Sequence, residues 1–259
     1  MTEPKILFDD GFVYERVMGV WSALAGNLFL DWLSPAKGMS WIDVGCGNGA
    51  FTELIVKRCQ PARIHGIDPS EAQLVFARQR NTFSVVEFQT GSALALPFAN
   101  DSFDAAIMAL VIFFVPEPAK GVAEMTRVVK PGGTVAAYSW DILGGGLPYA
   151  PVGLELRALG VTMPMPPSPS ASLLPNLREL WSNAGLVAVE VLEMTVQRTF
   201  ENFEDFWITT QLAFSGTFAN MAPHDVDIVK TKVRDRLPPD DEGHINYSAR
   251  ANAIKGLVG

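Results

Sequence analysis

The chain has 259 residues, nearly half of them hydrophobic, which is enough for one α/β domain with a well-filled core. Its formal net charge of −8 disfavours a nucleic-acid partner, because an acidic surface repels phosphate groups. Two cysteines, Cys46 and Cys59, supply neither a disulfide framework nor a metal-ligand set, so we expect a cytoplasmic protein without a metal. The first residues lack an apolar signal core, and the longest apolar run, 105–115, is shorter than the ~20 residues of a membrane span.

Apolar side chains recur at helical spacing near the amino terminus, at Val13, Val17, Trp21, Leu24, Leu28 and Trp32. The spacing predicts one amphipathic helix, or two short helices that break near Gly19 or Gly26. Such a helix either covers one end of a sheet or closes over a bound ligand as a flap. Periodicity by itself favours neither interpretation.

A short apolar run that carries one acid, Trp41–Val44, predicts a buried strand. Three glycines follow it at alternate positions, Gly45, Gly47 and Gly49, and they let the backbone turn sharply and approach a ligand closely. A helix is expected directly afterwards, over 50–58. Strand, glycine turn and helix in this order predict a nucleotide pocket at the carboxyl end of a parallel sheet.

The glycine spacing distinguishes two classes of nucleotide-binding domain. The dinucleotide fingerprint has its third glycine at the sixth position, where this chain has Ala50. In addition, Asp43 lies inside the strand, and its carboxylate would repel a pyrophosphate but suit a cationic amine. A nicotinamide-dependent dehydrogenase is therefore the less favoured interpretation.

A second strand is expected over 62–68, and it ends on an acid. Because Asp68 follows the glycine turn by about 20 residues, its carboxylate can accept hydrogen bonds from both hydroxyls of a ribose. The alternative is a solvated acid in the turn before Pro69. Ser70 is expected to cap a helix that continues to Arg80.

The next segments continue the alternation of strands and helices. Strands are expected over 85–89, 105–111 and 134–140, a helix over 119–129, and a helix breaker at Lys130-Pro-Gly-Gly133. The strand over 105–111 is hydrophobic throughout, which is typical of a central strand buried on both faces. This alternation predicts an α/β fold with a parallel sheet.

The ordered series resembles the class I S-adenosylmethionine-dependent methyltransferases, and within them the UbiE-like, methyltransferase type 11 family. The first motif of these enzymes, acid-x-Gly-x-Gly-x-Gly, stands here as Asp43-Val-Gly-Cys-Gly-Asn-Gly49, and the match continues in order over 41–140. Tyr14-Glu-Arg16 and Met18-Gly-Val-Trp-Ser22 resemble the leader helix of such enzymes. The resemblance implies a Rossmann-like, doubly wound seven-stranded sheet, mostly parallel with an antiparallel last hairpin, plus a helical lid.

The resemblance also implies which residues contact S-adenosylmethionine, and it implies no metal. The expected contacts are Tyr14, Arg16, Trp21, Asp43, Gly45, Cys46, Gly47, Asn48, Gly49, Asp68, Pro69, Ser70, Gln73, Gly91, Ser92, Ala93, Ala109 and Leu110. The family usually has an acid near the adenine where this chain has Ser92. A hydroxyl there can accept a hydrogen bond but brings no charge.

One methyltransferase domain is expected over 1–259. Its parts are an N-terminal helical flap over 1–37, a cofactor-binding core over 38–140, a loop insertion over 141–176, and the last strands over 177–259 with a helical cap at about 200–243. The two last strands are expected over 186–196 and 245–257. Five aromatic residues of the cap are candidates for lining an acceptor site: Phe203, Phe206, Trp207, Phe214 and Phe218.

The expected reaction is an in-line displacement that moves a methyl group from S-adenosylmethionine to a small acceptor and leaves S-adenosylhomocysteine, with catalysis mainly by positioning. Phe113 and Phe114 indicate an apolar or aromatic acceptor, but the same residues would serve a plain core. No catalytic base is assigned; the candidates are His224, His244, Tyr14 and Asp141, and His65 is expected to be structural. The alternative is a non-catalytic protein that binds S-adenosylmethionine or S-adenosylhomocysteine.

Overall fold

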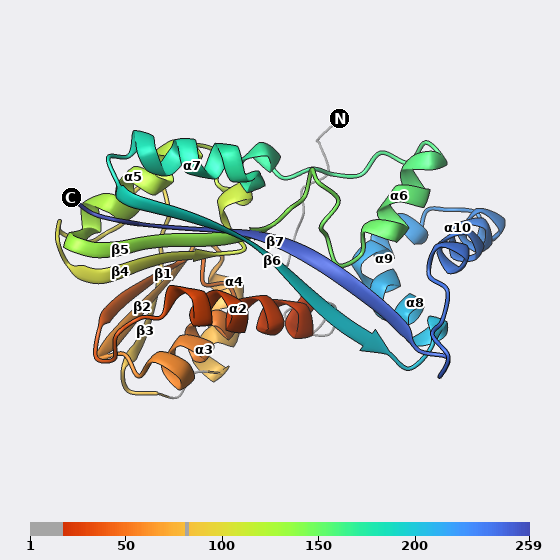
Figure 1. Ribbon diagram of the computed structural model, residues 1–259, viewed down its shortest axis with the longest axis horizontal. Helices are drawn as coiled ribbons and strands as arrows, with labels where there is room; N and C mark the ends of the chain where they lie inside the picture. Colours follow the sequence, from red (N-terminus) through yellow and green to blue (C-terminus); the bar gives the residue numbers. More distant parts are fainter. Residues whose placement is uncertain (1–17, 81–82) are drawn as a thin grey trace.

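The computed structural model describes residues 18–80 and 83–259, so the predictions made for Tyr14 and Arg16 lie outside the described residues. The centre of the fold is a seven-stranded sheet in the order β3-β2-β1-β4-β5-β7-β6 (Figure 1). Its strands are β1 (Ser40–Val44), β2 (Arg63–Asp68), β3 (Val86–Thr90), β4 (Phe103–Ala109), β5 (Val129–Trp140), β6 (Val187–Phe200) and β7 (Ile245–Leu257). The pairs among β1 to β5 are parallel, whereas β7 is antiparallel to both β5 and β6. The predicted mostly parallel sheet with an antiparallel last hairpin is confirmed.

Helices cover both faces of this sheet (Figure 1). On one face lie α2 (Val20–Leu33) and α3 (Ala50–Cys59), and on the other lie α5 (Pro118–Val128) and α7 (Leu174–Asn183). The remaining described helices are α4 (Glu71–Arg80), η2 (Ile112–Phe114), α6 (Ala150–Ala158), η3 (Pro169–Ser172), α8 (Phe203–Gln211), η4 (Leu212–Phe214), α9 (Ser215–Phe218) and α10 (Pro223–Arg236). In the described part of the chain, no helix is long and apolar enough to cross a membrane.

The hydrophobic sequence of the central strand β4 follows from its burial on both faces. Ala105 and Ile107 pack with the residues of α2 and α3, whereas Ala106 and Met108 pack with those of α5 and α7. Successive side chains of a strand point to opposite faces, so a strand with helices on both sides is apolar at every position. This is the burial that the continuous run in the sequence predicts.

Helix α2 continues through Gly26, where the sequence left a break open. A Cβ atom at Gly26 would lie 2.9 Å from Leu54 Cδ2 and 3.2 Å from Phe51 Cδ2 of α3. The glycine therefore lets the two helices approach closely. The helix covers the sheet with Trp21, Ala25 and Phe29, which are all buried.

Several boundaries differ from the sequence expectation: β4 is Phe103–Ala109 instead of 105–111, and β6 continues to Phe200 instead of ending at 196. Strand β5 begins at Val129 and includes 130–133, because Gly132 N donates to Val258 O (2.8 Å) and Val258 N donates to Gly133 O (2.9 Å). Pairing with the last strand thus keeps this glycine-containing segment extended. The segment 141–176, expected to be a loop insertion, contains helix α6 and the short η3.

Helices α6, α8, α9 and α10 gather at the far end of the long β6–β7 hairpin (Figure 1). The five aromatic residues named above as candidate lining are buried there, and they pack on one another; the rings of Phe203 and Trp207 lie 6.4 Å apart, and those of Trp207 and Phe218 lie 5.5 Å apart. Buried Glu155 of α6 also accepts a hydrogen bond from Arg236 of α10. These helices therefore extend the core on the α2 side of the sheet with an aromatic cluster.

Gly133 tests the close packing of β5. A Cβ atom at Gly133 would lie 2.7 Å from Asp104 O and 2.9 Å from Lys130 O, and backbone oxygens cannot rotate away. We expect Gly133→Ala to lower the free energy of unfolding by ~1–3 kcal/mol, measured by urea denaturation. Gly216→Ala is the control, because a Cβ there meets nothing within 4 Å and alanine favours the helix. Equal stability of the two variants would contradict the packing at Gly133.

Candidate functional site

The carboxyl ends of β1, β2 and β4 open into one cavity of about 960 Å³. Its lining joins the glycine turn after β1, the end of β2, the turn after β3 and the end of β4 to residues of α2 and α3. In an open α/β sheet, ligands bind in the crevice at this edge. The cavity lies where the sequence places the nucleotide pocket.

The glycine turn has a backbone that other residues adopt only with strain. Gly45, Gly47 and Gly49 have φ angles of 79°, 52° and 77°. A Cβ atom at Gly45 would lie 2.5 Å from Val111 Cγ1, so the turn also needs a missing side chain. The amides of Gly45 and Cys46 donate to Ile67 O at 2.7 and 3.0 Å, which fixes the turn against β2. Gly49 caps α3 and is not among the described residues that line the cavity.

Asp68 joins the two strand ends at the cavity floor. Its Oδ2 accepts a hydrogen bond from Gly47 N (2.9 Å), and its Oδ1 accepts one from Ser70 N (2.8 Å). Burial raises the pKa of Asp68, and these two hydrogen bonds lower it in part. Ser70 Oγ in turn accepts from Gln73 N (3.3 Å), which is the predicted cap of α4.

Asp43 is a fully buried acid that also lines the cavity. Its Oδ2 accepts a hydrogen bond from Thr52 Oγ1 (2.6 Å), whereas its Oδ1 has no partner among the described residues. Burial raises the pKa of Asp43 to about 7; the Thr52 hydrogen bond lowers it and the nearby Asp68 charge raises it further. An unpartnered buried carboxylate oxygen is costly, so it favours a cationic or hydrogen-bonding ligand.

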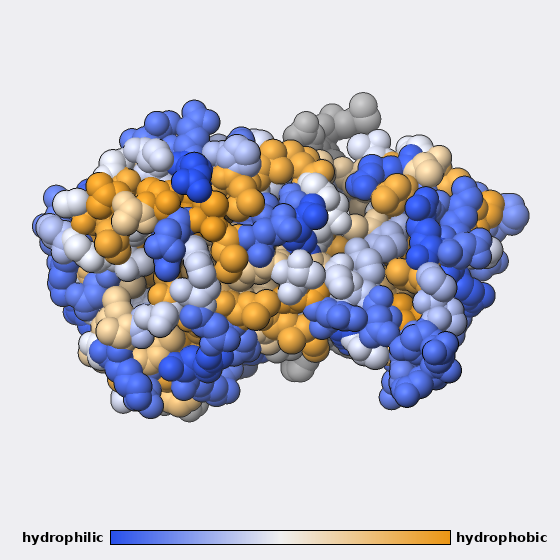
Figure 2. Space-filling model, in the orientation of Figure 1, coloured by the Kyte–Doolittle hydropathy of each residue, from blue (hydrophilic) through white to orange (hydrophobic). Residues whose placement is uncertain are grey.

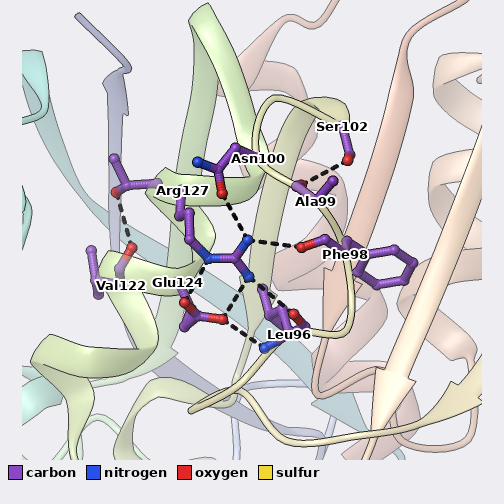
Figure 3. Close-up of polar contacts among 9 residues, drawn as sticks. Leu96, Phe98, Ala99, Asn100, Ser102, Val122, Glu124 and Arg127 are labelled. Carbon is purple, nitrogen blue, oxygen red and sulfur yellow. Dashed lines mark hydrogen bonds and ion pairs between the residues drawn. The ribbon is translucent and has the colours of Figure 1, made fainter.

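An arginine clamp holds the chain beyond β3 against α5 (Figure 3). Arg127 donates to Phe98 O (2.8 Å) and Leu96 O (3.0 Å), and it forms a double hydrogen bond with Glu124. Glu124 also accepts from Leu96 N (2.7 Å). The clamp thereby anchors the segment that follows the turn at 91–94, which lines the cavity.

Ser92, in that turn, has a local structural role. Its Oγ accepts a hydrogen bond from Leu94 N (3.1 Å), and the residue is exposed at the cavity edge. Gly91 N donates to Asp68 O (3.1 Å), so the turn is tied to the end of β2.

At the end of β4, Leu110 lines the cavity with a φ angle of 62° and donates its N–H to Tyr138 O (2.8 Å). A leucine with this backbone is strained, and such strain often marks functional sites.

A second part of the cavity lining, the apolar wall, was mostly missed by sequence reasoning. It consists of Ala23 of α2, Phe51 and Leu54 of α3 and Tyr138 of β5. Phe114 of η2 and the charged Glu53 and Lys57 of α3 line the cavity as well. The Tyr138 ring centroid lies 4.7 Å from that of Phe29 and 5.5 Å from that of Phe51. The available signal was the face of the predicted helix over 50–58 that carries Phe51 and Leu54.

Several proposed site residues lie elsewhere. Trp21 is absent from the described cavity lining and packs in the core, with its ring 6.3 Å from Phe200. Phe113 also packs in the core, on the face covered by α5, whereas Phe114 reaches the cavity. Trp21 thus anchors α2 to β6 and does not line the cavity.

Three of the candidate bases lie outside the described cavity lining, and Tyr14 lies outside the described residues. His224 lies in the first turn of α10, His244 lies beside Asp240, and Asp141 forms an ion pair with Arg250 (2.6 Å). His65 packs against Phe98, and burial lowers its pKa, as expected for a structural histidine. Among residues 18–80 and 83–259, no three histidine, cysteine, aspartate or glutamate side chains form a group that could hold a metal ion.

Comparison with known proteins agrees with this architecture. Residues 42–137 match a family described as a methyltransferase domain. An uncharacterized protein of Mycobacterium tuberculosis is 31% identical over 181 residues, which cover 70% of this chain and 61% of the relative. The ubiquinone/menaquinone biosynthesis C-methyltransferase UbiE of Paracoccus denitrificans is 36% identical over 116 residues, 43% of this chain and 46% of the relative.

A solved structure shows the same fold. Phosphoethanolamine N-methyltransferase 2 of Haemonchus contortus, in complex with phosphomonomethylethanolamine and S-adenosylhomocysteine, superimposes with a TM-score of 0.62 at 18% identity. The match covers 97% of this chain and 58% of that chain. Residues 42–137 therefore belong to the methyltransferase domain family, on the class I sheet. The chain spans less than two thirds of the length of the curated relatives described above.

The raised pKa of Asp43 has a consequence for stability. In the unfolded chain this carboxyl ionises near 3.8, but in the fold it holds its proton up to about pH 7, so its ionisation weakens folding as the pH rises between these values. We expect Asp43→Asn to gain stability relative to the wild type from pH 5 to pH 7, by at most about 1.4 kcal/mol per pH unit, and to level off above pH 7. Urea denaturation at each pH measures this.

Asp104→Asn is the matched control. The Lys130 ion pair and the hydrogen bonds from Ser40 lower the pKa of Asp104 to about 2. This carboxyl is therefore ionised between pH 5 and pH 8 in both the folded and the unfolded chain. Its effect on stability should therefore be independent of pH in that range. A flat difference for Asp43→Asn as well would show that Asp43 titrates normally.

Proposed function

We propose that this chain binds S-adenosylmethionine in the cavity and transfers its methyl group to a small apolar or aromatic acceptor. The observation that carries the proposal is the joint placement of the strained glycine turn, Asp68 and Asp43 on one cavity floor. The methyltransferase family match over residues 42–137 supports it. S-adenosylmethionine would supply a methyl group that its sulfonium already activates for in-line displacement.

The residues of the floor fit this cofactor. The glycine turn offers backbone with no Cβ at Gly47, where a Cβ would meet nothing within 4 Å, and this suits close approach of the methionine portion. The carboxylate of Asp68 lies at the end of β2, where it would also accept hydrogen bonds from the hydroxyls of the ribose. The unpartnered Asp43 Oδ1 would accept a hydrogen bond, and a cation beside it would favour the ionised carboxylate. Ser70, Gln73, Gly91, Ser92 and Ala93 would surround the adenosine.

The apolar wall defines the acceptor class that we propose. A cavity of about 960 Å³ lies at the upper end of the range for small-molecule sites, which leaves room for an acceptor beside the cofactor. Phe51, Leu54 and Tyr138 would contact an apolar or aromatic ring. The chain would act mainly by aligning the two molecules and by excluding water, without a metal. The two free cysteines are consistent with a reducing, cytoplasmic setting.

Mass spectrometry tests transfer directly. Purified protein is incubated with S-adenosylmethionine and a panel of phenols, quinols and small acids, and each acceptor is examined for the added methyl group. A methylated acceptor together with S-adenosylhomocysteine supports the enzyme. Tight cofactor binding without any methylated product across the panel favours the alternative, a non-catalytic protein that binds S-adenosylmethionine or S-adenosylhomocysteine.

Asp68 is the residue with the largest expected effect on the cofactor. Asp68→Ala removes a charged hydrogen-bond acceptor and releases Gly47 N, so we expect donor binding to weaken by about 1–3 kcal/mol, or roughly 5–150-fold in Kd. Calorimetric titration with S-adenosylmethionine measures it. Glu87→Ala is the control, since this exposed acid lies on β3 outside the described cavity lining. Unchanged affinity in Asp68→Ala would remove Asp68 from the site.

Leu54 separates acceptor binding from cofactor binding. Leu54→Asn places an amide in the apolar wall, and we expect the KM of an apolar acceptor to rise about 10-fold or more through the lost burial. The Kd of S-adenosylmethionine should change less than about twofold, because Leu54 lies away from the charged floor. Steady-state kinetics and calorimetry give the two numbers. Weaker binding of S-adenosylmethionine with an unchanged KM of the acceptor would place Leu54 in the cofactor site.

A further inference from the structure

Strand β6 leaves one edge of the sheet open. The strand order ends on β6, and within residues 18–80 and 83–259 nothing pairs with its outer edge. Its 14 residues extend over roughly 46 Å at the usual rise per residue. An edge of this length presents a row of unpaired N–H and C=O groups that can pair with another strand.

This edge has few of the features that block pairing. The bulge between Val187 and Glu190, with Ala188 at a φ angle of 49°, disrupts one end of the strand. From Val189 to Phe200 the sequence contains neither proline nor lysine. The face towards α2 is apolar in the middle of the strand, where Met194 and Val196 are buried. A free edge with these properties is suited to pairing.

The same face carries two charged residues, one near each end. Glu190 and Arg198 share a face with Met194, because alternate side chains of a strand point the same way. The side chain of Glu190 is 60% exposed and lies 3.4 Å from Lys255. Arg198 lies over the ring of Phe200 at 4.4 Å; its Nη1 is buried without a hydrogen-bond partner in the described chain, and the charge of Asp205 acts on this guanidinium.

A two-fold axis through Met194 would place these two opposite charges across from each other. In an antiparallel pair of β6 strands centred there, Glu190 of one copy faces Arg198 of the other, since both are four residues from the centre. The same register sets Leu192 opposite Val196. Shifting the centre by one residue would place Glu190 opposite Val196 or Phe200 instead, which leaves the charges unpaired.

We propose that two copies of this chain form a dimer by antiparallel pairing of their β6 edges about Met194. This interaction surface goes beyond the proposed enzymatic function and does not depend on it. A two-fold interface is self-complementary, as the placement of Glu190 and Arg198 requires.

Helix α2 extends the surface beside β6 (Figure 1). Val20, Leu24 and Leu28 form an exposed apolar stripe, with 36–45% of each residue accessible. Figure 2 shows hydrophobic surface over this helix. Trp21 of the same helix packs against Phe200 of β6, so the stripe lies on an element fixed to the open strand. In the proposed dimer the stripe would lie next to the strand pairing, and apolar area of this kind stabilises dimers.

Charge reversal tests this interface. The full-length protein is studied by sedimentation equilibrium over a range of concentrations, and the wild type is expected to be a dimer. Glu190→Arg and Arg198→Glu each create two like-charge contacts per dimer, so each should weaken dimerisation by on the order of 10-fold or more. The double variant E190R/R198E restores both pairs with reversed sign and should return to within about threefold of the wild type.

A second variant and two controls keep the test decisive. Leu24→Asp should also weaken the dimer, because it places a charge within the apolar stripe. Glu87→Arg, a charge reversal on the opposite edge strand β3, should leave the dimer unchanged. Circular dichroism confirms that each variant is folded. A wild type that is monomeric at about 100 μM, or a dimer that resists both single reversals, would overturn the proposal. Failure of the double variant to recover would also overturn it.

Discussion

The Asp68 carboxylate is the contact on which the candidate site depends. It accepts one hydrogen bond from the glycine turn that follows β1 and one from Ser70, the residue that caps α4. A buried carboxylate is stable only when its oxygens have partners, so the fold positions both amides around it. The turn, the helix start and the acid are consequently fixed relative to one another. A ribose that approached this edge would meet an acceptor that is already oriented.

The two sides of the cavity differ in chemistry, and this contrast supports the proposed reaction. The floor has two acids, Asp43 and Asp68, and backbone without side chains at the glycine turn. The wall has the rings of Phe51 and Tyr138, which are held by their packing on Phe29. A cationic donor would be attracted to the floor, and an apolar acceptor would be bound by the wall. Positioning of two molecules needs a rigid site, and both sides belong to buried elements of the sheet and its helices.

The sequence predicted the sheet and the cavity floor because their requirements are local. Positive φ angles in the turn require glycines, a strand buried on both faces requires an apolar run, and Asp68 follows a strand directly. The apolar wall could not be predicted in this way. Helical spacing identifies an apolar face but not the surface that it meets. The resemblance assigned Trp21 to the cofactor, whereas in the structure it packs against Phe200. The aromatic residues of α8, η4 and α9 were candidates for an acceptor site, and the structure places them in the core that also contains Trp21 and Phe200.

Calorimetric titration of the purified protein with S-adenosylmethionine, with NAD as a parallel ligand, tests the central claim most directly. The acid inside the strand and the glycine spacing predict micromolar binding of S-adenosylmethionine and no binding of NAD. Binding of NAD alone would contradict the account, because the floor would then accommodate a pyrophosphate despite Asp43. Absence of heat with S-adenosylmethionine, on protein shown to be folded and free of cofactor, would contradict it as well.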